Sequence, residues 1–94
     1  MAASILQDEK KCYVCGTLNN LHEHHVFFGA NRKVSEENGF KVWLCGDHHN
    51  QSNRGVHCGN KELNLMLKKH CQMTFEETHS REEFMALIGK NYLD

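Results

Sequence analysis

Apolar and polar positions alternate along two short segments in the first half of the chain, which predicts a pair of β-strands. The segments are 21–28, where a run of histidines leads into three apolar residues, and 40–44, which reads Phe-Lys-Val-Trp-Leu. Between them, 35–38 predicts one helical turn that ends at Gly39, a residue suited to a left-handed C-cap. A short helix or tight turn is expected over 45–51. The first half therefore predicts a hairpin followed by a short helix.

The second half has helical periodicity instead. Asn60 can cap a helix that reaches about residue 78, because its side chain can accept a hydrogen bond from the first turn. Ser80 and Glu83 match a capping box and predict a final helix through Ile88. Two C-terminal helices are therefore expected.

A chain of 94 residues has the length of one domain, and its hydrophobic core is marginal at this size. We therefore expect a single domain, 1–94, of the α+β class, with a metal-stabilised core over 12–60 and a helical cover over 60–94. No run of 18 or more apolar residues occurs in the sequence, so neither a membrane span nor a membrane partner is expected. The net charge is −1, with +2 over 1–75 and −3 over 76–94, which favours a polyanionic partner only weakly.

Cysteine and histidine spacing gives the strongest chemical signal. Cys12 and Cys15 form a C-x2-C pair, and a C-x2-H pair follows at Cys45 and His48. Two short loops that each supply two ligands can surround a tetrahedral zinc ion, so we expect a structural Zn²⁺ site that clamps both ends of the hairpin. Ordinary buried cysteines are the alternative. Thiols paired in this way, with no signal peptide, favour the reducing cytoplasm over a secreted disulfide framework.

A second set of histidines interleaves with the first. His24 and His25 lie between the two pairs, and His49 and His57 follow them. Histidines without a sulfur neighbour suit an open, catalytic metal site, although a surface cluster is the alternative. In a strand His24 and His25 point to opposite faces, so one could bind a metal while the other acts as a base. His22 shares the face of His24 and is expected to lie behind the metal ligands or at the surface.

Four elements in this order resemble the zinc-ribbon branch of the HNH endonucleases, in particular small phage-encoded members. They are the C-x2-C pair, His-His-Val at 24–26, Trp-Leu-Cys-x2-His-His at 43–49 and Gly-Val-His at 55–57. The resemblance covers roughly residues 12–60, about half of the chain. It implies a ββα-metal hairpin and helix that bind one divalent ion, Mg²⁺ or another, against the scissile phosphate of DNA.

The resemblance also implies residue roles. His25 lies at the position of the general base. Metal-ligand positions are implied for His24, His49 and His57, the last as a helix-borne ligand. The family's Asn commonly lies nine positions before the last His, where this sequence has Phe40, and Asn38 is the nearest candidate. The second zinc pair of the family usually ends in Cys, so that His48 and His49 could exchange roles.

The expected function is therefore a divalent-metal-dependent endonuclease that cuts DNA. Neighbouring phosphates are expected to contact Arg32, Lys33, Lys41 and Arg54. A non-catalytic zinc module that binds nucleic acid or a protein is the main alternative, and an adaptor that docks through the acidic C-terminal helices is another. A homodimer or a larger phage or host complex is compatible with the resemblance, as is the cytoplasm of a host cell.

Overall fold

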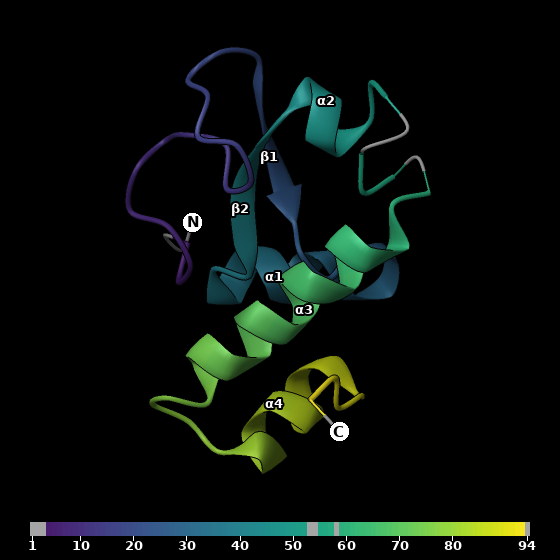
Figure 1. Cartoon of the computed structure of the whole chain (residues 1–94). Helices are drawn as coiled ribbons and strands as arrows, with labels where there is room; N and C mark the ends of the chain where they lie inside the picture. The colour runs from purple at the N-terminus through teal and green to yellow at the C-terminus, as the bar shows by residue number, and fades with distance from the viewer. Residues whose placement is uncertain (1–3, 53–54, 58, 94) are drawn as a thin grey trace.

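In the computed structural model, residues 4–52, 55–57 and 59–93 are described, and they form a small sheet covered by helices (Figure 1). The sheet has two antiparallel strands, β1 (Leu21–His25) and β2 (Lys41–Cys45). The other elements, in chain order, are the 3-10 turn η1 (Gly29–Asn31) and the helices α1 (Arg32–Asn38), α2 (Gly46–His49), α3 (Lys61–Phe75) and α4 (Arg81–Ile88). The expected α+β class is confirmed.

The strands lie where the alternation predicts them, but β1 is shorter than expected. It ends at His25, before the predicted limit at Phe28. The N–H of Phe27 donates to Ser35 Oγ at 3.2 Å, and that hydroxyl donates to the carbonyl of Phe27 at 2.6 Å. Because α1 takes both backbone groups of Phe27, this residue cannot pair in the sheet.

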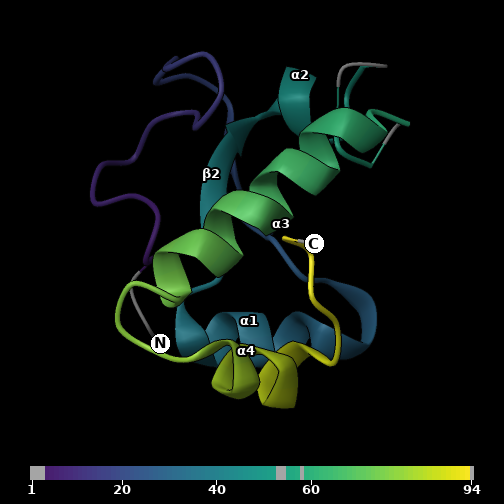
Figure 2. The same cartoon turned by 60° about the horizontal axis from the view of Figure 1, so that its bottom comes forward.

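α1 is longer than the single turn that the sequence predicts. It begins at Arg32 and ends at Asn38, and Gly39 then adopts the predicted left-handed conformation with φ of 74°. Ser35 is fully buried, and its carbonyl accepts the N–H of Phe40 at 2.9 Å. These bonds hold α1 across the end of the hairpin, next to α4 (Figure 2).

Side-chain caps start the two C-terminal helices where the sequence predicts them. Asn60 Oδ1 accepts an N–H from the first turn of α3 at 3.1 Å. Ser80 Oγ accepts the N–H of Glu83 at 3.1 Å, and the Glu83 carboxylate accepts the N–H of Ser80 at the same distance. α3 ends at Phe75, short of the predicted residue 78, where the N–H groups of Glu77 and Thr78 bond to carbonyls three residues earlier. No helix in the described ranges is long and apolar enough to cross a membrane.

Phenylalanines from separate segments form the centre of the core. They are Phe27 after β1, Phe40 before β2, Phe75 at the end of α3 and Phe84 in α4. Contacting rings have centroids 5.5 to 6.1 Å apart in edge-on or tilted arrangements, which are favourable for aromatic pairs. In Figure 2, α3 crosses in front of β2 while α4 lies beside α1. The aromatic cluster thus joins the helical cover to the hairpin.

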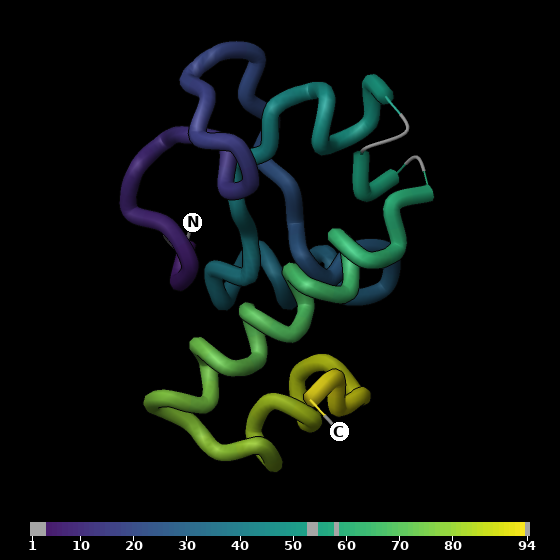
Figure 3. The backbone as a smooth tube through the Cα atoms, viewed as in Figure 1, coloured from purple at the N-terminus to yellow at the C-terminus, as the bar shows by residue number. Residues whose placement is uncertain are grey.

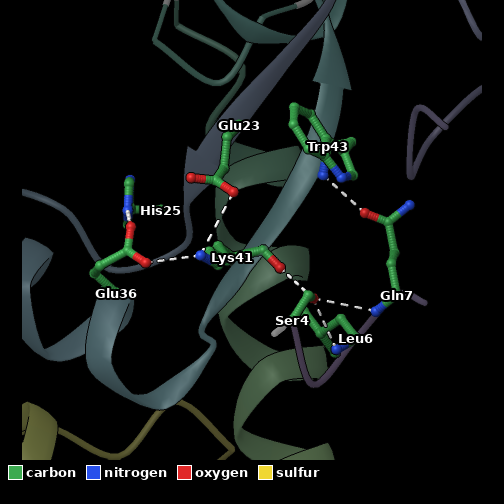
Figure 4. Close-up of polar contacts among 8 residues, drawn as sticks. All are labelled: Ser4, Leu6, Gln7, Glu23, His25, Glu36, Lys41 and Trp43. Atoms are coloured by element: carbon green, nitrogen blue, oxygen red, sulfur yellow. Dashed lines mark hydrogen bonds and ion pairs between the residues drawn. The ribbon is translucent and has the colours of Figure 1, made fainter. Parts of the chain in front are cut away.

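The N-terminal segment covers the outer edge of β2, and the tube in Figure 3 shows it running alongside the strand. The N–H of Tyr13 donates to the carbonyl of Trp43 at 2.8 Å, and Gln7 Oε1 accepts the N–H of Trp43 at 2.7 Å. Ser4 donates its hydroxyl to the carbonyl of Lys41 (Figure 4). An uncovered edge would offer these groups to another strand, so the segment protects the sheet from edge pairing.

The core assignment predicts a large cost for truncating Phe84, whose ring is fully buried. Phe84→Ala should lower the free energy of unfolding by about 3–5 kcal/mol in chemical denaturation of the metal-loaded protein. Met85→Ala, at a side chain 42% exposed, should change it by less than about 0.5 kcal/mol. Equal losses in both variants would contradict this packing.

Candidate functional site

Three cysteines and one histidine converge beside the hairpin: Cys12, Cys15, Cys45 and His48. Their ligand atoms all lie within 4.8 Å of one another. Cys15 Sγ is 3.8 Å from Cys45 Sγ, and His48 Nδ1 is 3.2 Å from Cys45 Sγ. A tetrahedron of ligands with zinc bonds of about 2.0–2.3 Å has edges of about 3.3–3.8 Å. The predicted ligand set therefore lies together and could bind a metal such as zinc.

Local structure brings these groups together from two directions. The N–H of Gly16 donates to the carbonyl of Cys12 at 2.9 Å, which closes the first loop, and Gly16 adopts a φ of 76° that favours glycine. On the other side, Cys45 ends β2 and His48 lies one helical turn later on α2. The set thus connects the N-terminal loop, the sheet and α2.

The cysteine environment favours a thiolate. Burial by itself would raise the pKa of the Cys12 thiol, but backbone N–H groups, including those of Cys15 and Cys45, outweigh it and lower the pKa to about 6. Burial raises the pKa of Cys45, and the neighbouring sulfurs of Cys12 and Cys15 contribute in the same direction. One thiolate among crowded thiols is an arrangement that a divalent cation stabilises by displacing the remaining protons.

A second cluster consists of imidazoles alone: His24 of β1, His49 of α2 and His57 in the loop that follows. Their ring centroids are 4.8 to 5.3 Å apart. His24 is 2% exposed, His49 is half-buried and His57 is exposed, so the cluster opens to solvent on one side. His24 Nε2 is buried without a hydrogen-bond partner in the described part of the chain. A buried ring nitrogen without a hydrogen-bond partner lowers the stability of the fold unless an ion or another group binds it.

Two imidazoles of this cluster, His24 and His49, have lowered pKa values that favour the neutral form. Burial lowers the pKa of His24 to about 3, and the neighbouring His49 and His57 contribute. Burial also lowers the pKa of His49 to about 4, with contributions from His57 and His22. Neutral imidazole is the form that ligates metals. Because imidazole suits zinc, copper, nickel and iron whereas Mg²⁺ prefers oxygen, the donor set fits a transition-metal ion better than the expected Mg²⁺.

Backbone hydrogen bonds place His57 beside α2. The N–H of Val56 donates to the carbonyl of His48, and the N–H of His57 donates to that of His49, both at 3.0 Å. Gly55 allows this approach, because a Cβ there would lie 2.6 Å from the carbonyl oxygen of His49. His57 lies in a turn, which corrects the expectation of a helix-borne ligand: α2 ends at His49, and the chain returns to the cluster through a loop.

His22 is a fourth histidine that contacts this cluster. It shares the β1 face of His24, and its Nδ1 lies 2.9 Å from Nδ1 of His49. When His49 donates its Nδ1 proton to His22, its Nε2 is left unprotonated as a possible metal ligand. Histidine ligands are commonly oriented by such an acceptor. His22 therefore fits the role of a residue that orients His49.

His25 lies on the opposite face of β1, since adjacent residues of a strand alternate. Its Nε2 is 2.9 Å from Glu36 Oε1, and Lys41 Nζ donates to Glu36 Oε2 at 2.7 Å (Figure 4). Glu23 lies 3.5 Å from the same ammonium. The structure thus turns His25 toward these carboxylates and away from the imidazole cluster that His24 joins. The sequence analysis did not identify Glu36, because its contact with His25 depends on the orientation of α1.

The structure does not place Lys41 at the exposed position that the predicted contact with DNA requires. Lys41 is paired with His25 in the strand register and is only 5% exposed. The hydrogen bond from Lys41, followed by that from His25, lowers the pKa of Glu36 to about 2, and Glu36 in turn raises the pKa of Lys41. Glu23 and Glu36 bind the ammonium of Lys41 on the face of the sheet that carries His25. Lys41 is therefore not available to a phosphate.

Asn38 does not lie with the histidines. Its Nδ2 donates to the carbonyl of Val34 at 2.9 Å, within α1. It lines a pocket with Phe75 and His79 at the C-terminal end of α3, whereas His57 precedes the N-terminal end of that helix. α3 has 15 residues and is about 22 Å long. This placement removes the basis for a catalytic role of Asn38, since its side-chain amide is hydrogen-bonded within α1.

The other predicted residues have simpler placements. Arg32 and Lys33 are exposed at the start of α1, where Lys33 lies 4.0 Å from Glu37. Cys71 belongs to neither ligand set; it is fully buried in α3, and burial raises the pKa of its thiol, so it behaves as a small core residue. Arg54, a predicted phosphate contact, lies outside the described residues.

Comparison of the chain with models of protein families, with curated proteins and with solved structures gave no match. The geometry itself provides a Cys3His set that could bind zinc and, next to it, an open set of imidazoles. The function has to be inferred from these two sets.

The two clusters predict two classes of bound ion. Metal analysis of the purified protein should find one zinc ion that resists mild chelation and a second, exchangeable ion. Cys12→Ser should remove the first and unfold the protein in circular dichroism, since structural zinc contributes about 10–16 kcal/mol against a typical net stability of about 5–15 kcal/mol. His57→Ala should remove only the exchangeable ion. Unchanged metal content in His57→Ala would contradict the second site.

The lowered pKa values of His24 and His49 also predict how metal binding depends on pH. Three imidazoles with ordinary pKa values near 6.5 would lose about fiftyfold in affinity between pH 7.5 and 6.0, because each must lose a proton to bind. His24 and His49 are half-protonated only near pH 3 and pH 4, so both remain largely unprotonated at pH 6.0. We therefore expect a loss of less than about tenfold, measured by Co²⁺ titration with the cysteine set filled with zinc. A fiftyfold loss would contradict the burial of the cluster.

Proposed function

We propose that this chain is a metal-dependent nuclease of the HNH type that hydrolyses phosphodiester bonds in DNA. The observation that carries the proposal is the convergence of His24, His49 and His57 on a solvent-accessible point beside the Cys3His set. An open site built from protein ligands is typical of catalytic metal centres, whereas structural centres are closed. The order of a hairpin and a short helix supports the proposal, as does the sequence resemblance.

When bound, a divalent ion acts as a Lewis acid that stabilises the charge developing on a phosphoryl group. The chain's own contribution is to present imidazole ligands at a fixed position. His24 is buried on β1, and His49 and His57 are tied together by the backbone hydrogen bond between their peptide groups. The exposed His57 marks the side from which a substrate can approach.

Two histidines of β1 are candidates for the base that removes a proton from water. His25, the base implied by the resemblance, donates Nε2–H to Glu36, and its Nδ1 is then the unprotonated nitrogen. A carboxylate partner of this kind fixes the tautomer of a catalytic histidine. His22 lies on the same strand face as the ligand His24 and contacts His49 directly. His25 and His22 lie on opposite faces of β1, so alanine variants of each can show which of them acts as the base.

A second candidate function is a non-catalytic zinc module that binds nucleic acid or a protein. The engagement of His25 by Glu36 favours it, because a histidine held in the ion-pair network with Lys41 can be purely structural. In that case the imidazole cluster binds metal without turnover.

The proposal predicts that the protein nicks supercoiled plasmid when supplied with Mn²⁺, Co²⁺ or Zn²⁺, and less well with Mg²⁺. Replacing the base by alanine should lower the rate about 10²–10⁴-fold, and excess metal should not restore it. Replacing a residue that only orients a ligand should lower metal affinity about 10–100-fold, and excess metal should restore the rate. His25→Ala and His22→Ala, each titrated with metal, therefore assign the two roles.

His70→Ala is the matched control, because His70 is exposed on α3, contacts Tyr13 and belongs to neither cluster. It should cleave like the unaltered chain, while His24→Ala should not cleave. Equal cleavage by His24→Ala would identify a contaminating nuclease. Metal binding without any metal-dependent cleavage would favour the binding module.

A further inference from the structure

Phe28 is a large apolar side chain exposed next to the imidazole cluster. Its side chain is 40% exposed, although it directly follows the buried Val26 and Phe27. Its ring centroid lies 5.0 Å from that of His57 and 5.8 Å from that of His24. Because Phe28 and His57 are both exposed and in contact, an aromatic surface borders the open side of the candidate metal site.

One ammonium group contacts this aromatic surface, and a second lies beside the neighbouring ring of Tyr92. Lys68 Nζ lies 5.2 Å from the ring centroid of Phe28 and 5.4 Å from that of Tyr92, and Lys90 Nζ lies 5.1 Å from the Tyr92 ring. In the described part of the chain, neither lysine forms an ion pair with a carboxylate. Burial and the charge of Lys90 lower the pKa of Lys68. No carboxylate within 4–52, 55–57 and 59–93 pairs with these neighbouring cations, so an anion there would relieve their repulsion.

We infer that Phe28, Lys68 and Lys90 form a subsite for an unpaired nucleotide of the substrate strand, with the base on Phe28 and a backbone phosphate at the lysines. The inference rests on the proposed nuclease function and names its substrate class, which is DNA with a single-stranded segment. An aromatic face beside ammonium groups is the combination that binds single strands without reading their sequence.

The aromatic contact selects against a closed duplex. In a duplex both faces of each base are already stacked on neighbouring bases, so an exposed ring can stack only on a base that has left the helix. Lysine contacts to phosphate, in contrast, are available in single and double strands alike. Phe28 should therefore determine the preference for single strands, while Lys68 should contribute to the affinity for both.

The test is equilibrium binding of a labelled oligonucleotide and of its duplex, with the zinc-loaded protein and no further divalent ion. Phe28→Ala should weaken single-strand binding about 5–150-fold, the equivalent of about 1–3 kcal/mol per stacked base, and leave duplex binding within about twofold. Phe28→Leu keeps an apolar side chain but removes the aromatic face, so it should show the same selective loss. Met73→Ala is the control, because Met73 is 56% exposed elsewhere on α3 and should change neither affinity.

Lys68→Gln provides an independent measurement. Loss of one phosphate contact should reduce the slope of log affinity against log salt by about 0.7 for the single strand, whereas Lys11→Gln, at a lysine in the N-terminal segment, should not change it. The inference is overturned when Phe28→Leu binds single strands normally, when it loses single-strand and duplex affinity equally, or when Lys68→Gln keeps the original slope.

A third variant separates this inference from the proposed function. His49→Ala should abolish cleavage and keep the Phe28-dependent preference for single strands. Cleavage by a Phe28→Leu protein with unchanged single-strand binding would leave the nuclease proposal standing and overturn the subsite. Phe28-dependent single-strand binding in a chain that never cleaves would overturn the nuclease proposal and support the subsite.

Discussion

The structure depends on the convergence of Cys12, Cys15, Cys45 and His48. His48 lies on α2, a helix of four residues, and so short a helix is not stable by itself in water. Ligation of His48 would fix α2, and with it the direction of the next side chain, His49. The carbonyls of the same two residues then hold Val56 and His57. The Cys3His set thereby positions the imidazole cluster, so loss of the first metal site should remove the second metal site as well.

Most of the fold could be predicted from local sequence because it is determined locally. Asn60 and Ser80 cap their helices through contacts within one turn, and Gly39 ends α1 in the left-handed conformation. The strands follow from alternation of apolar residues. The end of β1 and the length of α1 could not be predicted, since both depend on Ser35, whose hydroxyl bonds to a backbone eight positions earlier in the chain.

The candidate site was predictable to the extent that spacing determines it. Paired ligands two residues apart identify the Cys3His set, and the histidines that follow identify the second set. The face of the sheet that each side chain occupies was harder to predict from the sequence. The burial of Lys41 and the pairing of His25 with Glu36 require the strand register and the orientation of α1. Phe28 and Lys68 are 40 residues apart in the sequence, and only the packing of α3 brings them together.

The charge balance of the imidazole cluster connects the proposed chemistry to the proposed substrate. His24, His49 and His57 contribute no negative charge, so a bound divalent ion would keep both of its positive charges. Carboxylate ligands would offset that charge, but the carboxylates of Glu23 and Glu36 contact Lys41 and His25 instead, on the opposite face of β1. The ammonium of Lys68, which forms no ion pair with a carboxylate within the described residues, adds to the positive field beside Phe28. An electrophilic centre in a positive, partly aromatic surface is complementary to a phosphodiester flanked by an exposed base, and it offers little to a neutral or cationic substrate.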